Sequence, residues 1–260
     1  MLRIAAGIIH GRDTWLTEVV ESLVGQVDRI FIWNNRPAFS FSSEKIHNLG
    51  TANNYGCARG CYELMRIADD QGFDAIVLAN DDAVCFPGYV EASSAILKQM
   101  PRVAYVSTPL TNCGPFPMLD EKGDGVVAFQ GCVEGRVLEL MSVAPLIRLQ
   151  AAREIGHWPT WFFQHSHETH FCWDLWRHNW QVWQLKDEYL HHYGGHQGKD
   201  ILGPDREAIL QQDTWRLYWW WKQLPLAEWK RIKEVAPFLY KYVFVKHHLC
   251  SHYGIRPEEA

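Results

Sequence analysis

The residues with the clearest chemical potential are three consecutive polar residues, Asn80, Asp81 and Asp82, which directly follow a short apolar run. Adjacent carboxylates repel each other, so ionising both beside a buried strand is unfavourable unless a cation lies near them. Carboxylate oxygens are also the ligands that Mg²⁺ and Mn²⁺ prefer. Asn and Asp equally favour turns in which the side chain bonds its own backbone. Taken alone, the triplet leaves a metal site and a plain turn open.

A second cluster, residues 191–196, contains three histidines and two glycines. An imidazole in a glycine-rich loop can reach a metal ion or a diphosphate, because glycine allows the backbone to approach closely. A zinc site is disfavoured, because no thiol stands at ligand spacing. The alternative is a solvated surface loop. We favour a functional role for His192 because this loop follows a predicted strand.

Glu168 opens an apolar stretch with helical spacing. A carboxylate near a helix N-terminus interacts favourably with the helix dipole, which is a purely structural role. The same carboxylate could act as a general base that takes a proton from an acceptor hydroxyl. The residues themselves leave both interpretations open.

The elements that would position these residues form an alternating pattern. Apolar runs at residues 2–9, 29–33 and 75–79 are typical of buried parallel strands. Residues 16–24 and 58–71, which lie between the runs, have helical spacing. For the first of these helices, Asp13 or Thr14 is the expected N-cap and Gly25 the expected stop. We therefore predict an α/β fold, Rossmann-like, with a mostly parallel sheet flanked by helices.

A polar cluster follows each of these three strands. His10 and Arg12 follow the first, Asn34 and Asn35 the second, and the Asn80 triplet the third. Ligands of open α/β sheets bind outside the carboxyl ends of the strands, where strand order reverses. The three clusters are therefore expected to converge on one crevice. In that context we favour the metal interpretation of the triplet.

The remainder of the chain is less regular. Residues 109–125 and 188–203 are expected to be loops, and residues from 205 onward to be helical with breaks at Pro225 and Pro237. We predict one domain over residues 1–203 and a helical, aromatic-rich C-terminal extension over 204–260 packed on it. Core packing is favoured for its aromatics. The alternatives are a platform for the acceptor, membrane-surface contact or homo-oligomer formation. Predicted strands cover residues 126–129, 136–142 and 181–185, and predicted helices cover 149–155 and 168–178.

Composition excludes several classes of function. The formal net charge of −5 argues against general nucleic-acid binding, which needs an excess of Lys and Arg. Seven scattered cysteines without a CxxC pair favour reduced thiols. Arg3 and His10 interrupt the apolar stretch at the N-terminus, so no secretory leader is expected. A cytoplasmic location follows as an expectation.

Taken in order, these motifs resemble those of the inverting glycosyltransferases of family 2, which adopt the GT-A fold. The resemblance spans about residues 2–198 and rests on order and spacing. Asn80 stands where that family has the first acid of its DXD element, and His167 stands where it usually has Glu. The matching segments are His10-Gly11-Arg12, Asn34-Asn35, Asn54 to Gly60, Asn80-Asp81-Asp82, Phe86-Pro87-Gly88-Tyr89, Ala144 to Arg148, Ile155 to Trp158, His167 to Trp183, and His192 to Gly195.

The resemblance implies transfer of a sugar, with inversion, from a nucleotide-diphospho-sugar to a hydroxyl acceptor. It implies a Mn²⁺ or Mg²⁺ ion bound by Asp82 and His192, with Asp81 beside it, and Glu168 as catalytic base. The acceptor is a glycan, a lipid, a protein or a modified base. The residues implied to bind the nucleotide-sugar are His10, Arg12, Asn34, Asn35, Asn54, Arg59, Asn80 and Asp81.

Two alternatives remain at this point. A nucleotidyltransferase would share the sheet and the acidic metal site, but the chain lacks a Gly-rich, Lys-bearing loop near the first strand. A non-catalytic nucleotide-sugar-binding relative could have lost activity through Asn80. Binding without turnover would identify that case.

Overall fold

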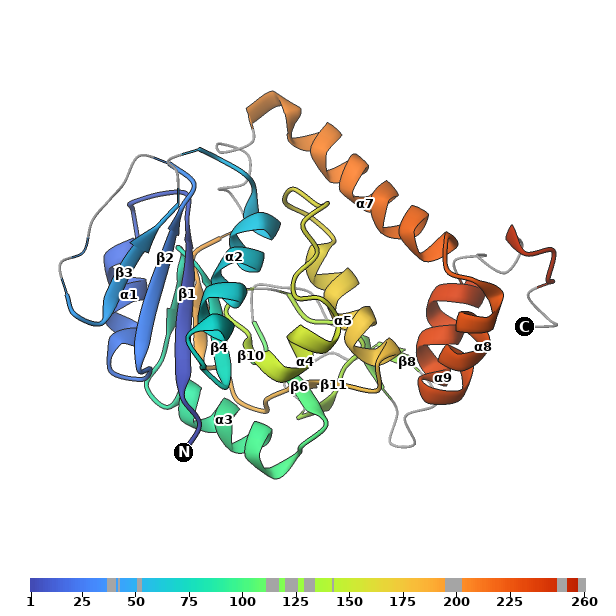
Figure 1. Cartoon of the computed structure of the whole chain (residues 1–260), viewed down its shortest axis with the longest axis horizontal. Coiled ribbons are helices and arrows are strands. Elements are labelled where there is room, and N and C mark those ends of the chain that lie inside the picture. The colour runs from blue at the N-terminus through green and yellow to red at the C-terminus, as the bar shows by residue number, and fades with distance from the viewer. Residues whose placement is uncertain are drawn as a thin grey trace.

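A computed structural model provides the structure of the protein (Figure 1). The structure describes residues 1–36, 41, 43–50, 53–110, 117–119, 126–128, 134–141, 143–194, 203–246 and 252–256. Most of the loop expected at 109–125 lies outside the described residues, and so does His196.

An eight-stranded sheet, in the order β3-β2-β1-β4-β10-β6-β11-β9, forms the centre of the molecule. Its strands run parallel, except that β10 and β9 are antiparallel to their neighbours. This confirms the predicted mostly parallel α/β sheet. The strands are β1 (Ile4–His10), β2 (Arg29–Asn34), β3 (Ile46–Leu49), β4 (Ala75–Asn80), β6 (Val103–Ser107), β9 (Gly135–Arg136), β10 (Leu146–Arg148) and β11 (Gln181–Gln184). Two small sheets pair β5 (Ala83–Cys85) with β12 (Leu190–His192) and β7 (Pro117–Leu119) with β8 (Val126–Ala128).

Helices cover both faces of this sheet, because its strands are apolar on both sides. One buried cluster joins α1 and α3 to one face, and the other joins α2, α4 and α5 to the opposite face. Adjacent residues of β1 divide between the clusters: Ala5 belongs to one, Ala6 to the other. The helices are α1 (Leu16–Val24), α2 (Cys57–Asp70), α3 (Tyr89–Gln99), α4 (Leu149–Glu154) and α5 (His167–Arg177).

Several local expectations were wrong. Helix α1 begins after Trp15, which makes no side-chain capping bond, so neither Asp13 nor Thr14 is its N-cap. The segment expected as a loop over 188–203 contains β12, because its short run pairs with β5. Of the described residues of the strand expected at 136–142, only Arg136 lies in a strand, at the end of β9. Strands of two or three residues carry too little periodicity to be recognised in sequence.

The C-terminal segment is helical and packs on the domain. Helix α7 (Arg206–Lys222) leads to α8 (Leu226–Val235), α9 (Pro237–Leu239) and a π-helix (Tyr240–Lys246). Trp221 and Trp229 are fully buried and belong to the same cluster as α2 and α5, whereas Trp215 and Trp219 are exposed. Figure 1 shows α7 running along the upper edge of the molecule towards α8 and α9. Among the described helices, none is long and apolar enough to cross a lipid bilayer.

A buried carboxylate attaches α7 to the loop that precedes α5. Asp213 has no exposed surface, and its oxygens accept hydrogen bonds from the backbone N–H groups of Phe163, Gln164 and His165 at 2.8–3.1 Å. Arg216 pairs with the same carboxylate at 2.9 Å. Asp213 therefore fixes the entrance to α5 from a distant part of the chain.

We expect Asp213→Ala to lower the free energy of unfolding by about 3 kcal/mol, because three backbone donors lose a charged acceptor. Urea unfolding followed by circular dichroism measures this change. Asp205→Ala is the control, because Asp205 is exposed at the start of α7 and makes no side-chain capping bond. Equal stability of both variants would contradict the proposed anchor.

Candidate functional site

The ends of β1, β2 and β4 lie side by side. In the parallel registers, His10 is opposite Asn34, and Ile9 is opposite Asn80. The chain adds β2 and β3 on one side of β1 and β4 on the other, so strand order reverses here. The predicted convergence of three polar clusters is therefore confirmed, at the position where open α/β sheets bind ligands.

Asp81 connects the end of β4 to the loop after β1. Its Oδ2 accepts hydrogen bonds from the backbone N–H groups of Gly11 and Arg12, at 2.6 and 2.5 Å. The carboxylate thus lies directly beneath this loop. Asp81 orients the Gly11–Arg12 backbone, and the half-buried Arg12 side chain extends from a fixed position.

His10 and Asn34 are buried and bonded to each other. The His10 Nδ1 atom is 2.7 Å from Asn34 Oδ1, and its Nε2 is 2.9 Å from Asp13 Oδ1. Asn34 Nδ2 donates to the carbonyl oxygen of Leu49 at 3.0 Å. His10 has no exposed surface and Asn34 is only 4% exposed. Both side chains therefore lie inside the protein and hold the ends of β1 and β2 together.

Asp82 points towards the histidine-containing loop. His192 Nε2 lies 3.3 Å from Asp82 Oδ1, and the N–H of Tyr193 donates to the Asp82 carbonyl oxygen at 3.0 Å. The pairing of β12 with β5, which places His192 opposite Ala83, produces this contact. Two residues that are far apart in the sequence thus meet at the strand ends.

The backbone at Gly194 approaches Asp82 and His192 closely. A Cβ at position 194 would overlap the His192 imidazole and come within 3.2 Å of Asp82 Oδ2. The preceding Tyr193 stacks on Trp15 with ring centroids 4.8 Å apart and hydrogen-bonds Glu18 at 2.9 Å. The loop is therefore held against α1, and glycine allows its backbone to lie against the two side chains.

This pair fits one side of a divalent-ion site. Within the described ranges, no group of three or more His, Cys, Asp and Glu residues is arranged to hold a metal. Mg²⁺ and similar ions in nucleotide enzymes usually take one or two protein ligands and complete their shell with phosphate and water. The carboxylate of Asp82 and the imidazole of His192 would supply two such protein ligands.

Asn35 joins β2 to the start of α2. Its Nδ2 donates to the carbonyl oxygen of Gly56 at 3.2 Å, while Asn54 Oδ1 accepts the Gly56 N–H at 2.9 Å. Gly56 has a φ of 84°, and a Cβ there would overlap the carbonyl oxygen of Phe163. Only glycine fits at this position, where the loop before α5 crosses the N-terminus of α2.

Arg59 and Asn80 border the same end of the sheet. Arg59, in the first turn of α2, pairs with Glu63 at 2.5 Å and lies over the ring of Tyr62. Its side chain is 47% exposed, so the guanidinium is accessible while its direction is fixed. Asn80 is half-buried at the end of β4.

Glu168 lies in the first turn of α5. Cys57, the first residue of α2, interacts with His167 and Glu168, so the N-termini of the two helices adjoin. Glu168 Oε2 is 3.3 Å from His167 Nδ1, which also lies 3.1 Å from the indole nitrogen of Trp158. Burial disfavours the charged imidazole, but the neighbouring Glu168 and Cys57 raise the pKa of His167 to about 9, so His167 and Glu168 stabilise each other's charged forms. Glu168 Oε2 is buried and has no hydrogen-bond partner among the described residues.

Sequence reasoning missed three residues that support the site. Asp13 was considered only as a helix cap, although its spacing of three residues from His10 hinted at a contact. Trp15 and Asp213 gave no signal, because their partners, Tyr193 and the loop at 163–165, are distant in sequence. Such contacts exist only after the chain has folded.

The electrostatics of Asp81 differ from those of an ordinary surface acid. Burial raises the pKa of its carboxyl group from 3.8 to about 6, against the opposing effect of the N–H donors of Gly11 and Arg12. Neighbouring Asp82 raises this pKa further. The native protein therefore binds a proton more tightly than the unfolded chain, and stability falls as the pH rises from about 4 to about 6. The ionised group costs about 3 kcal/mol at neutral pH.

Comparison with known proteins gives matches at the level of structure. No protein-family model matches the chain, and no curated protein sequence matches it. GalNAc-T7, in a crystal structure with UDP, GalNAc and Mn²⁺, superimposes with a TM-score of 0.58 and 11% identity over 98% of this chain. S. aureus TarS 1–349 superimposes with a TM-score of 0.55 and 10% identity, covering 96% of this chain and 88% of TarS.

A third match, A197 from STIV, has a TM-score of 0.50 and 11% identity, covering 75% of this chain and 87% of A197. The present chain spans 58% of the GalNAc-T7 chain. At these identities the matches establish the fold. The protein has a GT-A-like glycosyltransferase fold, as the sequence resemblance implied.

We expect Asp81→Asn to raise the free energy of unfolding at pH 7.5 by about 1–3 kcal/mol, because it removes a buried charge while keeping an oxygen acceptor. At pH 4.5 the gain should be much smaller, since the wild-type carboxyl is then mostly protonated in the native state. Urea unfolding at the two pH values measures the difference.

Asp28→Asn is the matched control for this substitution, because Asp28 also accepts a backbone N–H from β1, at its opposite end. No stabilisation is expected for it. A loss of stability for Asp81→Asn of the same size at both pH values would show that the two N–H donors outweigh burial.

Proposed function

We propose that this protein transfers a sugar from a nucleotide-diphospho-sugar to a hydroxyl acceptor, with inversion at the anomeric carbon and assistance from Mn²⁺ or Mg²⁺. The observation that carries the proposal is the meeting of Asp82 and His192 at the strand ends, beside Asp81 and the Gly11–Arg12 loop. The structural likeness to GalNAc-T7, crystallised with UDP, GalNAc and Mn²⁺, supports it.

The donor would lie across the ends of β1, β2 and β4. Arg12 and Arg59 provide accessible positive charge on either side of the crevice, and Asn35, Asn54 and Asn80 provide amide groups. His10 and Asn34 act indirectly, because both are buried and hold the loops that carry the other residues. This arrangement gives the chain a fixed, polar edge for a nucleoside diphosphate.

Asp82 and His192 would hold the divalent ion, and Asp81 would keep the adjoining loop in place. When bound, such an ion neutralises charge that develops on a diphosphate leaving group. The ion and the ionised carboxylates also stabilise one another, which would offset the cost of burying Asp81.

Glu168 would act as the general base. Its buried Oε2 has an unused lone pair, so it can accept the proton of an acceptor hydroxyl. The hydroxyl oxygen then forms a bond to the anomeric carbon, while the bond from that carbon to the diphosphate breaks and its electrons leave with the nucleoside diphosphate. Because bond formation and cleavage occur on opposite faces, a single displacement inverts the configuration.

The metal assignment predicts a ligand-dependent change in melting temperature. UDP or dTDP with Mn²⁺, at about 100 times the Kd, should stabilise the wild type by about 2.7 kcal/mol, which raises Tm by roughly 5 °C or more. Asp82→Asn should remove the part of the shift that depends on Mn²⁺, because the ion loses its carboxylate ligand. Thermal unfolding with and without Mn²⁺ measures both effects.

Asp187→Asn is the control, since Asp187 is exposed. It should keep the full shift. A Mn²⁺-dependent shift that persists in Asp82→Asn would remove Asp82 from the metal site.

The base assignment predicts a loss of turnover without a loss of donor binding. Glu168→Gln keeps the size of the side chain but cannot take a proton, so kcat for transfer should fall by about 10²–10⁴. A nucleotide-sugar panel, read by release of the nucleoside diphosphate, measures turnover, and calorimetry measures binding. Glu207→Gln, on the surface of α7, should behave as wild type.

Binding by the wild type without any turnover would instead indicate a non-catalytic relative. Turnover of Glu168→Gln at the wild-type rate would exclude Glu168 as the base.

A further inference from the structure

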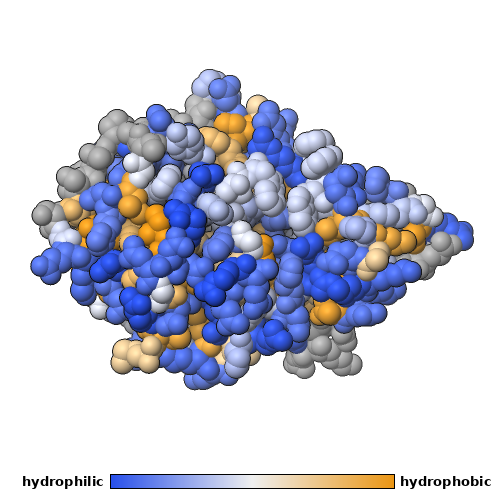
Figure 2. Space-filling model, in the orientation of Figure 1, coloured by the Kyte–Doolittle hydropathy of each residue, from blue (hydrophilic) through white to orange (hydrophobic). Residues whose placement is uncertain are grey.

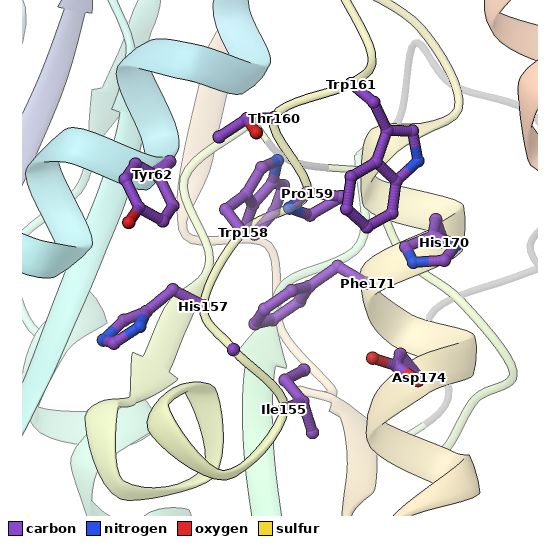
Figure 3. A pocket seen from close by; sticks show the side chains of 11 residues that line it. Tyr62, Ile155, His157, Trp158, Pro159, Thr160, Trp161, His170, Phe171 and Asp174 are labelled. Carbon is purple, nitrogen blue, oxygen red and sulfur yellow. The ribbon is translucent and has the colours of Figure 1, made fainter.

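A cavity of about 240 Å³ lies between α2 and α5 (Figure 3). Tyr62 contributes from α2, residues 155–161 from the loop after α4, and His170, Phe171 and Asp174 from α5. Figure 3 shows Trp161, His170 and Asp174 along one side and His157 and Trp158 along the other. Tyr62 and Trp158 also contact the site described above, through Arg59 and His167, whereas the other lining residues are not part of it.

Aromatic rings form the walls of this cavity. Trp161 is 45% exposed, although it stacks on Trp220 with an interplanar angle of 11°. Trp158 stacks on Phe171 at a centroid distance of 4.4 Å and is fully buried. A large indole that remains exposed at a cavity offers an apolar face together with a polar edge. Figure 2 shows pale surface of intermediate hydropathy at the centre of this side of the molecule.

His170 provides a polar group that the protein leaves unsatisfied. The residue is 2% exposed, and its Nδ1 has no hydrogen-bond partner among the described residues. Its ring is enclosed by Trp161, at 5.2 Å, and by Trp220, at 4.6 Å. Burial, with Arg177 nearby, lowers the pKa of His170 to about 3, so the ring is neutral. An unsatisfied buried polar group costs about 1–3 kcal/mol, which a ligand hydroxyl would recover.

The charges around the cavity indicate a neutral ligand. Asp174 is paired with Arg177 at 2.7 Å, and His157 with Asp69 at 3.3 Å. Asp174, the acid among the lining residues, thus has a cationic partner already, and the lining His157 has an acidic one. The volume is below the roughly 300–1,000 Å³ of pockets for drug-sized ligands, so it suits a single ring.

We propose that this cavity binds a neutral hexopyranose ring, with a sugar face against Trp161 and a hydroxyl hydrogen-bonded to His170. Sugar rings present C–H groups on one face and hydroxyls around the edge, which matches an indole wall beside an unsatisfied imidazole. Trp158 lies between the cavity and the proposed base Glu168, because it lines the cavity and contacts His167. We assign the bound ring to a part of the acceptor next to the group that reacts. This assignment to the acceptor rests on the proposed function.

The test is saturation-transfer NMR on the whole protein with the methyl glycosides of glucose, galactose and N-acetylglucosamine. At least one of them should receive saturation from the wild type. Trp161→Ala should weaken the affinity about tenfold or more, because the stacking face is lost. Trp215→Ala removes an exposed tryptophan of α7 that does not line the cavity, and it should leave the affinity unchanged.

His170→Phe separates a ligand role from a packing role. It keeps a flat ring among the aromatics and removes the unsatisfied nitrogen, so Tm should stay the same or rise while glycoside binding falls. A fall in Tm with unchanged binding would overturn the role of His170. No saturation transfer to any glycoside, or equal losses in Trp161→Ala and Trp215→Ala, would overturn the cavity assignment.

Failure of the proposed function would appear separately. It would be seen as an absence of nucleotide-sugar hydrolysis or transfer by the wild type. Glycoside binding does not depend on that reaction.

Discussion

The two hydrogen bonds from Gly11 and Arg12 to the Asp81 carboxylate hold the end of β4 against the loop after β1. This contact lies where strand order reverses, so it fixes the strand ends at which open α/β sheets bind ligands. The next residue, Asp82, contacts His192 instead. Asp81 thus serves to hold the loop after β1, whereas Asp82 and His192 remain for the proposed ion.

The same end of the sheet is assembled from segments that are far apart in the chain. Asn35 reaches Gly56, Gly56 lies against Phe163, and Asp213 holds the backbone of the following residues. The entrance to α5, and hence Glu168, is therefore positioned by β2, α2 and α7 together. The C-terminal helices thus support the site even though they contribute no residue to the crevice.

Buried polar groups that are unfavourable in the ligand-free protein lie at both of the proposed ligand sites. Glu168 Oε2 and His170 Nδ1 are buried without hydrogen-bond partners among the described residues, and burial raises the pKa of Asp81. Each feature lowers the stability of the ligand-free protein. Such costs are common at functional sites, where stability is traded for reactivity or affinity.

The amino-acid sequence by itself determined the parallel core and the end of the sheet that carries polar residues. Apolar runs bounded by Asn, Asp and His show both features locally, because strand burial and loop polarity depend on residue type. The resemblance implied that His192 meets Asp82, but only the tertiary structure showed the pairing of β12 with β5 that brings them together, and the anchoring of the loop before α5 by Asp213. These contacts join residues far apart in the chain, and short strands or single buried acids leave no periodic signal. These contacts stabilise the protein only after the chain has folded and brought the distant residues together.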